Sequence, residues 1–516
     1  MVTFTTLEAC PVPYNLSAEP AGYTAKLRWT GYSDSYNIRY RTAMSNTWMT
    51  ATANAYASVE ISNLEGSTTY EFQVQGVCDG ETTDWSETFT FTTKVVRQTV
   101  RTGNWDVAST WDPAGVPAID EDVIVQHNVT VPAGVVAQAN NIIEGGSNAT
   151  RITLEEGAQL VHNRNGNLLQ ETEVIVKKDI TGHGSGNGNW YLIANPSTSS
   201  LEPDYSIYGF MSGSYDLYRF DYTGSDKKEW RNNKTTSFSL DVNQSGYLYA
   251  NEAGTTLNIY VDARPSNDRV SKRLTYTNGD YELPGWHLIG NPFVCTAYLV
   301  NSSGVALPYY RMNAEGTDLE AVASGTIAPM EAVFHNVSRT MTVYFTRTEP
   351  SRGGQLNITV ECGVSTGSTT AGSGTAGSTT AGLTTATVDN AIISFGEGEG
   401  LEKFSLREDA SRLYITQDGK DYAVAVVGRD GVHTVATMDV NFKAGEDGTY
   451  TLGFAGEEVE FSYLHLIDNV TGADVDLLSA GEHGSSPAMK AEGASYTFTA
   501  TTTDNANRFR LVFETK

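Results

Sequence analysis

The chain has 516 residues, with 61 acidic and 34 basic side chains and a formal net charge of −27. A chain of this length is too long for one core, so we expect about three to five domains. The acidic balance argues against a nucleic-acid partner, which needs a surface rich in lysine and arginine, and no apolar run is long enough to form a transmembrane segment.

Short runs of alternating apolar and polar residues fill the sequence, as in "EFQVQGV", "LNIYV" and "FRLVF". No sustained apolar stripe at helical spacing accompanies them. The pattern predicts an all-β fold, as a multidomain chain of β-sandwiches with a short parallel β-helix-like segment.

The first residues, "MVTFTTLEAC", lack the basic region and the long apolar stretch of a signal peptide. Two interpretations stay open at this point. The protein is either cytoplasmic, or the chain is a mature or excised piece of a longer secreted protein. The domains that follow favour the second interpretation.

Residues 6–95 predict seven short strands separated by regularly spaced turns, which is the pattern of an immunoglobulin-like sandwich. The run "AKLRWTG" places Trp29 on the inner face, and Leu64 precedes Tyr70 by the spacing of a tyrosine corner. This ordered set of landmarks resembles a fibronectin type III domain. Such domains are usually spacers or protein-binding modules.

Two cysteines lie in this first domain, one at its front in "CPVPYNLSAEP" and one late in the domain in "VQGVCDG". These stretches resemble the variant of the domain found in secreted Bacteroidetes proteins. That resemblance implies a disulfide between Cys10 and Cys78 and an oxidising compartment. The alternative is two buried free thiols.

Residues 98–185 contain short β-branched runs such as "DVIVQ", "VTVP" and "EVIVKKDI", separated by turn residues. Runs at this pitch predict rungs of a parallel β-helix-like segment. The opening, with its Asn-Trp, Thr-Trp and Asp-x-Val-x-Ile, resembles β-helical surface proteins and adhesins. The segment has too few rungs for the enzymatic activity of a pectate lyase to be transferred.

Asp120, Glu121 and Asp122 stand together within this segment. They could supply oxygen ligands to Ca²⁺, but we favour a solvated turn and expect no cofactor. The eight histidines are scattered, without His-Glu-x-x-His or paired Cys-x-x-Cys motifs, so we expect no transition-metal site.

Residues 186–362 contain the skeleton Trp-x-Leu-Ile-x-Asn-Pro twice, beginning at Trp190 and at Trp286. Each copy is followed by a tyrosine-rich run and then by a long alternating run. We therefore predict two copies of one β-unit, residues 186–284 and 285–362, that pack against each other. The skeleton offers no nucleophile or acid–base pair, so it indicates a repeated fold: Trp, Leu and Ile fill the core, and Asn-Pro ends the strand.

The order of these elements resembles paired β-sandwich segments of large secreted Bacteroidetes proteins, which are often described as adhesin-like. The first copy is rich in aromatic residues, among them Tyr215, Tyr218 and Trp230. Exposed rings beside polar groups suit sugar or protein recognition, so these three are our candidate ligand-binding residues. The alternative is that alternate tyrosines face the core.

Residues 363–389 are almost entirely Ser, Thr, Gly and Ala and predict a flexible linker. Residues 390–516 return to alternating strands and predict a second sandwich. They resemble the domain that stands before the C-terminal sorting domain of proteins exported by type IX secretion. That sorting domain is not visible, which favours a trimmed fragment, and pairing of Cys295 with Cys362 stays open.

These features predict a non-catalytic, secreted or cell-surface, adhesin-like protein that binds a host or matrix protein or a glycan. The first alternative is an accessory or catalytic part of a secreted polysaccharide-degrading enzyme, which would need two carboxylates about 5–10 Å apart. The second alternative is a pure structural spacer. The sequence alone sets neither the ligand nor the oligomeric state.

Overall fold

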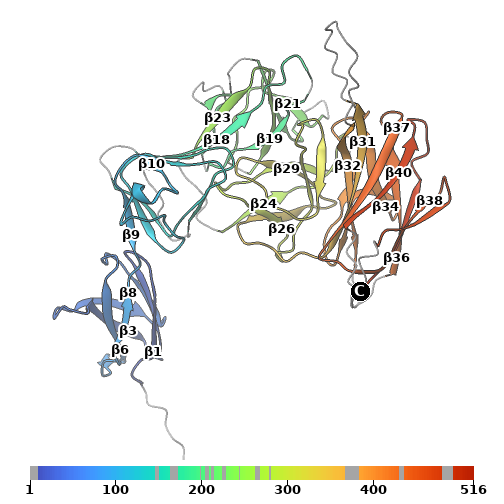
Figure 1. Cartoon of the computed structure of the whole chain (residues 1–516). Helices are drawn as coiled ribbons and strands as arrows, with labels where there is room; N and C mark the ends of the chain where they lie inside the picture. The colour runs from blue at the N-terminus through green and yellow to red at the C-terminus, as the bar shows by residue number, and fades with distance from the viewer. Residues whose placement is uncertain are drawn as a thin grey trace, which may run out of the picture. The chain divides into compact units, whose positions relative to one another are not determined.

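The computed structural model confirms the all-β fold (Figure 1). The chain forms two compact units, Met1–Lys178 with Asn258–Asn267, and Asp179–Leu257 with Asp268–Lys516. A 3₁₀ turn, η1 (Ala108–Thr110), lies among the strands. The structure describes residues 10–145, 150–162, 173–186, 188–197, 199–203, 208–210, 214–223, 228–242, 244–261, 268–277, 281–365, 383–428, 435–478 and 492–516.

The first unit begins with a two-sheet sandwich. One sheet contains β1 (Tyr14–Pro20), β2 (Ala25–Thr30) and β5 (Ser58–Ile61). The other contains β4 (Met49–Asn54), β3 (Ser35–Thr42), β6 (Thr69–Cys78), β7 (Glu81–Thr82) and β8 (Phe89–Thr92).

Three sequence landmarks of this sandwich lie where we expected them. Trp29 is buried, and the hydroxyl of buried Tyr70 accepts a 2.9 Å hydrogen bond from the amide of Glu65, as in a tyrosine corner. Cys10 and Cys78 form a disulfide across 68 residues of sequence. The covalent bond therefore ties the start of the domain to the end of β6.

Parallel ladders follow in the rest of this unit. Val129 pairs with Ile152 and Ile152 pairs with Val174, so successive strands stack at a short, regular interval. The sheets have the orders β10-β13-β16-β18-β23, β11-β9-β12-β15 and β14-β17. The strands are β9 (Val96–Thr99), β10 (Gly103–Asn104), β11 (Trp111–Asp112), β12 (Asp122–Val125), β13 (Val129–Val131), β14 (Val136–Ala139), β15 (Ile142–Glu144), β16 (Arg151–Leu154), β17 (Gln159–His162), β18 (Glu173–Ile180) and β23 (Thr255–Val261).

Each of the three acidic residues in this segment has its own protein partner. Asp120 pairs with Lys94 at 2.7 Å and Glu121 pairs with Arg97 at 2.7 Å. Buried Asp122 accepts hydrogen bonds from Asn140 and from the amide of Tyr23. Asp122 thereby joins this segment to the first sandwich within the same unit.

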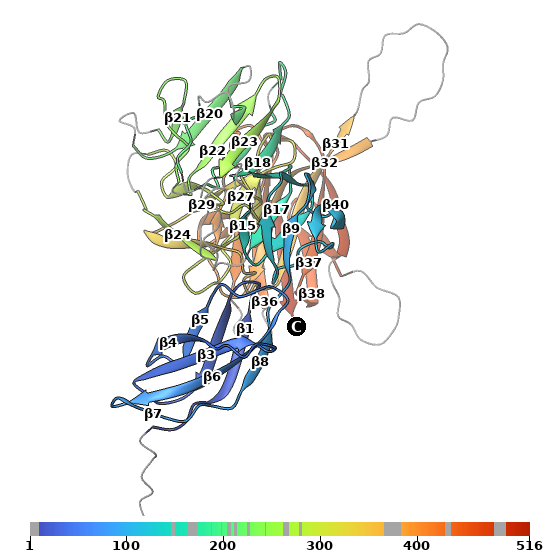
Figure 2. The ribbon, with the colours of Figure 1, turned by 90° about the vertical axis from the view of Figure 1, so that its left-hand side faces the viewer.

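Two four-stranded antiparallel sheets in the second unit have the same strand order. The first is β19-β22-β20-β21 and the second is β25-β29-β27-β28; Figure 2 shows β22, β20 and β21 side by side. Their bounds are β19 (Tyr191–Ala194), β20 (Tyr215–Phe220), β21 (Trp230–Asn232), β22 (Gly246–Asn251), β25 (Trp286–Gly290), β27 (Tyr309–Met312), β28 (Leu319–Val322) and β29 (Ala332–Asn336). A further sheet orders β24 (Arg269–Leu274), β30 (Met341–Thr346) and β26 (Tyr298–Val300).

The two equivalent sheets contact each other through reciprocal backbone hydrogen bonds. Ala194 donates to the carbonyl of Met330 at 2.8 Å, and its equivalent Gly290 donates to the carbonyl of Gln244 at 2.9 Å. Gly290 has to be glycine, because a Cβ there would lie 2.4 Å from the Cβ of Ala194. The two copies therefore pack as a pseudo-symmetric pair.

The asparagine of each Trp-x-Leu-Ile-x-Asn-Pro skeleton has a structural role. Buried Asn195 accepts the amide of Ser197 and donates to the carbonyls of Ser199 and Leu240. Asn291 is fully buried and makes the same pattern, with donation to three carbonyls at 2.9–3.0 Å. The repeated asparagine fixes the chain reversal after the strand, which agrees with a repeated fold.

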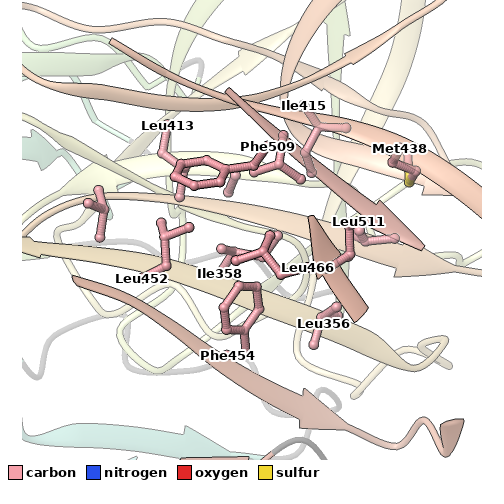
Figure 3. Packing of buried hydrophobic residues seen from close by; sticks show 14 of the residues in the cluster. Leu356, Ile358, Leu413, Ile415, Met438, Leu452, Phe454, Leu466, Phe509 and Leu511 are labelled. Carbon is pink, nitrogen blue, oxygen red and sulfur yellow. The ribbon is translucent and has the colours of Figure 1, made fainter. Parts of the chain in front are cut away.

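The C-terminal strands form one continuous sheet of eleven strands that encloses a large core (Figure 3). Its path is β39-β38-β41-β36-β34-β35-β32-β31-β37-β40, with β33 beside β35. The strands are β31 (Gln355–Ser365), β32 (Leu383–Phe395), β33 (Leu401–Glu402), β34 (Arg412–Gln417), β35 (Lys420–Val427), β36 (Val435–Lys443), β37 (Gly448–Glu457), β38 (Phe461–Asp468), β39 (Ala473–Asp476), β40 (Glu492–Ala500) and β41 (Phe509–Thr515).

This sheet corrects the predicted linker. Residues 363–389 do not separate two domains, because β31 and β32 form one antiparallel ladder. At one end of the ladder Gln355 pairs with Ser394, and at the other end Ser365 pairs with Leu383. The low-complexity residues 366–382 lie outside the described residues. The C-terminal sheet thus begins near Gln355, within the range predicted for the second repeat.

Cys295 and Cys362, whose pairing the sequence left open, are both buried free thiols. Cys362 contributes to the core of the C-terminal sheet, whereas Cys295 lies in the second repeat. Burial raises the pKa of Cys295 to about 11 and also raises that of Cys362. Both groups are therefore protonated at neutral pH.

Candidate functional site: an aromatic pocket on the first repeat

A pocket of about 730 Å³ opens within the second unit, on the outer end of the first repeat's sheet. Its floor comes from β20, β21, β22 and the residue before β19, and its walls come from a turn of the second repeat and a segment of the C-terminal region. The lining residues are Gly188, Trp190, Tyr218, Trp230, Leu248, Thr317, Leu406, Arg407 and Asp409.

Three aromatic rings dominate the floor. The ring centroids of Trp190 and Tyr218 are 6.1 Å apart, and those of Tyr218 and Trp230 are 6.3 Å apart at 87°. All three side chains are half-buried. The rings therefore present apolar faces that solvent reaches.

The position of Trp190 depends on the hairpin turn of the second repeat. The amides of Asn189 and Trp190 donate to the carbonyls of Glu315 and Gly316 at 3.2 and 2.9 Å. Gly316 has φ +61°, and a Cβ at that position would lie 2.5 Å from the backbone nitrogen of Trp190. The glycine thus allows the turn to hold Trp190 at the pocket.

Two of the three predicted ligand-binding residues line the pocket, and the third does not. Tyr218 and Trp230 lie on the pocket face of the sheet. Tyr215 lies three residues before Tyr218 in β20, so its side chain points to the opposite face, where its ring packs 6.3 Å from that of buried Tyr249. Tyr215 is therefore not part of this site.

Trp190 is the pocket residue that sequence reasoning assigned to another role. We expected both tryptophans of the repeated skeleton to fill the core. Trp286 is buried at 5% exposure, whereas Trp190 is half-buried and lines the pocket. The skeleton itself held no signal for this difference, because both copies read Trp-x-Leu-Ile-x-Asn-Pro.

A charged pair stands at the mouth of the pocket. Arg407 donates to both carboxylate oxygens of Asp409 at 3.1 and 3.0 Å, and the two side chains are 50% and 76% exposed. The hydrogen bond from Arg407 lowers the pKa of Asp409, and the same pair raises the pKa of Arg407. Both groups stay charged over the physiological pH range and can orient a polar ligand.

The equivalent face of the second repeat is covered. Strand pairing makes Trp190, Tyr218, Leu248 and Trp230 equivalent to Trp286, Tyr310, Phe334 and Leu319, respectively. The second set is buried, at 0–6% exposure. Phe404 packs on it, with its ring centroid 4.6 Å from that of Trp286.

The pocket has the chemistry of a binding site. Glycoside hydrolysis needs two carboxylates at the reacting bond, and Asp409 is the single carboxylate among the lining residues. That carboxylate is neutralised by Arg407. Across the described residues, no group of three or more His, Cys, Asp or Glu side chains is arranged to hold a metal ion.

Comparison with known proteins identifies the first domain. The description "Fibronectin type III domain" matches residues 11–92, so the chain carries a fibronectin type III domain near its N-terminus. Such domains are typical of non-catalytic adhesion and spacer modules and occur in extracellular proteins. No curated protein sequence matches the chain.

Solved structures resemble part of the chain. The fibronectin type III domain of human collagen XX is 23% identical, with 18% of this chain and 100% of that chain covered and a TM-score of 0.16. The FN5 domain of Drosophila Lar is 17% identical, with coverage of 16% and 97% and a TM-score of 0.16. The human contactin 1 domain is 17% identical, with coverage of 18% and 87% and a TM-score of 0.16.

The described part of the chain contains no helix with the length and apolar character needed to cross a bilayer.

Proposed function

We propose that this protein is a non-catalytic, secreted or cell-surface, adhesin-like protein that binds a macromolecular partner through the pocket of the first repeat. The observation that carries the proposal is the contrast between two equivalent faces. One is buried under Phe404, while the other keeps Trp190, Tyr218 and Trp230 open around about 730 Å³. Exposed aromatic clusters of this kind mark recognition sites.

The remaining parts of the chain support an extracellular role in this proposal. The disulfide between Cys10 and Cys78 suits an oxidising compartment. The fibronectin type III domain and residues 98–185 would act as spacers that present the repeats. The resemblances of the N-terminal and C-terminal stretches favour a Bacteroidetes protein exported by type IX secretion.

An array of glycans and extracellular-matrix proteins, probed with the purified chain, tests the proposal. We expect specific binding that is lost in the double variant Trp190→Ala, Trp230→Ala and kept in Tyr215→Phe, which alters the opposite face of the same sheet. Calorimetry should show that the double variant keeps its folding transitions. Equal binding by the chain and the double variant would contradict a role for the pocket.

Enzymatic activity is the competing outcome. Turnover of a polysaccharide by the purified chain, abolished by one Asp or Glu substitution, would replace the proposed function with a hydrolase or lyase.

A further inference from the structure

The second repeat shows what a face of this kind holds. The segment Leu401–Leu406 crosses the rings of Trp286 and Tyr310, and Phe404 inserts among them. The ring centroid of Phe404 lies 4.6 Å from that of Trp286 and 5.5 Å from that of Phe334. An aromatic side chain of this chain is thus the occupant of the covered face.

The hydroxyl of Tyr310 fixes the backbone of this occupant. It accepts a 3.0 Å hydrogen bond from the amide of Phe404 and donates a 3.3 Å hydrogen bond to the carbonyl of Glu402. One tyrosine therefore pairs with a donor and an acceptor two residues apart, as an extended peptide presents them. Burial under the segment raises the pKa of Tyr310 well above its ordinary value.

The first repeat offers the same groups without the occupant. Trp190 and Tyr218 take the places of Trp286 and Tyr310. Among the residues that the structure describes, no hydrogen bond to or from the hydroxyl of half-buried Tyr218 is found. The pocket lies beside these two rings, where Phe404 lies in the second repeat.

We propose that the pocket of the first repeat binds an extended peptide segment that carries an aromatic side chain. This inference rests on the proposed function and names the chemical class of the ligand. The aromatic side chain packs on Trp190, and the hydroxyl of Tyr218 pairs with the peptide backbone, as Tyr310 does with residues 402–404. Arg407 and Asp409 at the mouth meet charged groups of the peptide.

Two substitutions between the repeats make the pocket different from its covered counterpart. Leu248 replaces Phe334 and Trp230 replaces Leu319, so two side chains that line the pocket differ in size from their covered counterparts. We therefore expect the first repeat to select its own peptides, with an aromatic residue as their common feature.

A library of random displayed octapeptides, selected on the immobilised full chain, tests the inference. Peptides that also bind the Trp190→Ala variant are removed at each round. We expect the enriched peptides to share an aromatic residue, and its replacement by alanine in a synthetic peptide to weaken binding at least about tenfold.

The variant Tyr218→Phe gives the sharper readout, because it removes only the hydroxyl. If that group pairs with a peptide backbone, binding of the selected peptide falls about five- to tenfold. The matched control Tyr215→Phe, in the same strand, should bind the peptide like the unaltered chain. An unchanged affinity of Tyr218→Phe would overturn the backbone pairing.

The glycan array separates failure of this inference from failure of the proposed function. If no peptide is enriched through Trp190, and glycan binding is lost in Trp190→Ala, the pocket is a sugar site and the peptide inference is wrong. If neither library nor array gives binding that depends on Trp190, both the inference and the proposed function are wrong.

Discussion

At the scale of single residues, the same motif position has acquired two roles. Trp190 and Trp286 begin identical skeletons and lie at equivalent places in equivalent sheets. Their surroundings differ, because Phe404 covers only Trp286. The first ring is therefore available to a ligand, while the second contributes to stability.

This difference predicts that replacement by alanine affects stability at Trp286 and ligand binding at Trp190. Trp286→Ala should lower the free energy of unfolding of the second unit by about 3–5 kcal/mol, because it leaves a cavity in a closed core. Trp190→Ala should cost about 1 kcal/mol or less, because solvent already reaches the ring, yet it should abolish ligand binding. Calorimetry of the full chain measures both, and a larger loss in Trp190→Ala would contradict the assignment.

The motif asparagine predicts a second effect. In Asn291→Asp, a carboxylate would face three carbonyl oxygens that now receive the side-chain amide. We expect a loss of about 3–5 kcal/mol, larger than the loss for Asn291→Ala, because a buried charge that faces three acceptors and receives one amide, from Phe293, is costlier than an empty site. A smaller loss for Asp than for Ala, measured by denaturation at pH 7, would contradict this role.

At the scale of elements, the low-complexity segment joins two neighbouring strands of one sheet. β31 and β32 are paired along eleven registered positions. Composition alone favoured a linker between domains, because Ser, Thr, Gly and Ala cannot form a core. The pairing of the flanking residues shows that the segment is an insertion between two paired strands.

Cleavage inside this segment tests that arrangement. A specific protease site placed between residues 370 and 376 should be cut without separation of the two fragments in native size-exclusion chromatography. Under denaturing conditions the fragments should separate. As a control, cleavage should leave the free energy of unfolding of the second unit within about 1 kcal/mol of the uncut chain, because the ladder persists. Free migration of the C-terminal fragment under native conditions would show an interdomain linker instead.

At the scale of the whole molecule, two histidines, one half-buried and one buried, make stability depend on pH. His287 and His335 are cross-strand partners in β25 and β29. Burial lowers the pKa of each to about 4, and for His287 the neighbouring His335 lowers it further. Both rings are neutral in the folded protein at pH 7.

The sign of the effect follows from these depressed values. Above about pH 6.5, the rings are neutral in both the folded and the unfolded state, so the two histidines do not lower the free energy of unfolding. Between pH 6.5 and 4 the unfolded state gains protons that the folded state does not, and each histidine costs about 1.4 kcal/mol per pH unit. The free energy of unfolding of the second unit, measured by denaturation between pH 7 and 5, should show this slope. The slope should become smaller in the double variant His287→Gln, His335→Gln.

A matched substitution outside the pair is the control for this slope. His465 lies in the C-terminal sheet beside Asp474, and His465→Gln should leave the slope that the histidine pair produces in place. An unchanged slope in the double variant would mean that other groups cause the pH dependence.

Local patterns were sufficient to predict much of this protein. The alternation of apolar and polar residues predicted the all-β fold, because successive side chains of a strand point to opposite faces of the sheet. The landmarks Trp29 and Tyr70 gave the fibronectin type III sandwich, since both depend on spacing within one short stretch. The boundaries of the remaining domains stay a prediction, apart from the start of the C-terminal sheet, which the β31–β32 ladder moves.

The pocket depended on contacts between segments far apart in sequence. The skeleton around Trp190 and the tyrosines of β20 were visible, but not which of the two faces of β20 would line a pocket. Nor could the sequence show that Phe404, more than 100 residues after Trp286, covers one copy and leaves the other open. Side-chain periodicity is a local property and determined the strands; whether a given face meets solvent or another segment is decided only when the whole chain has packed.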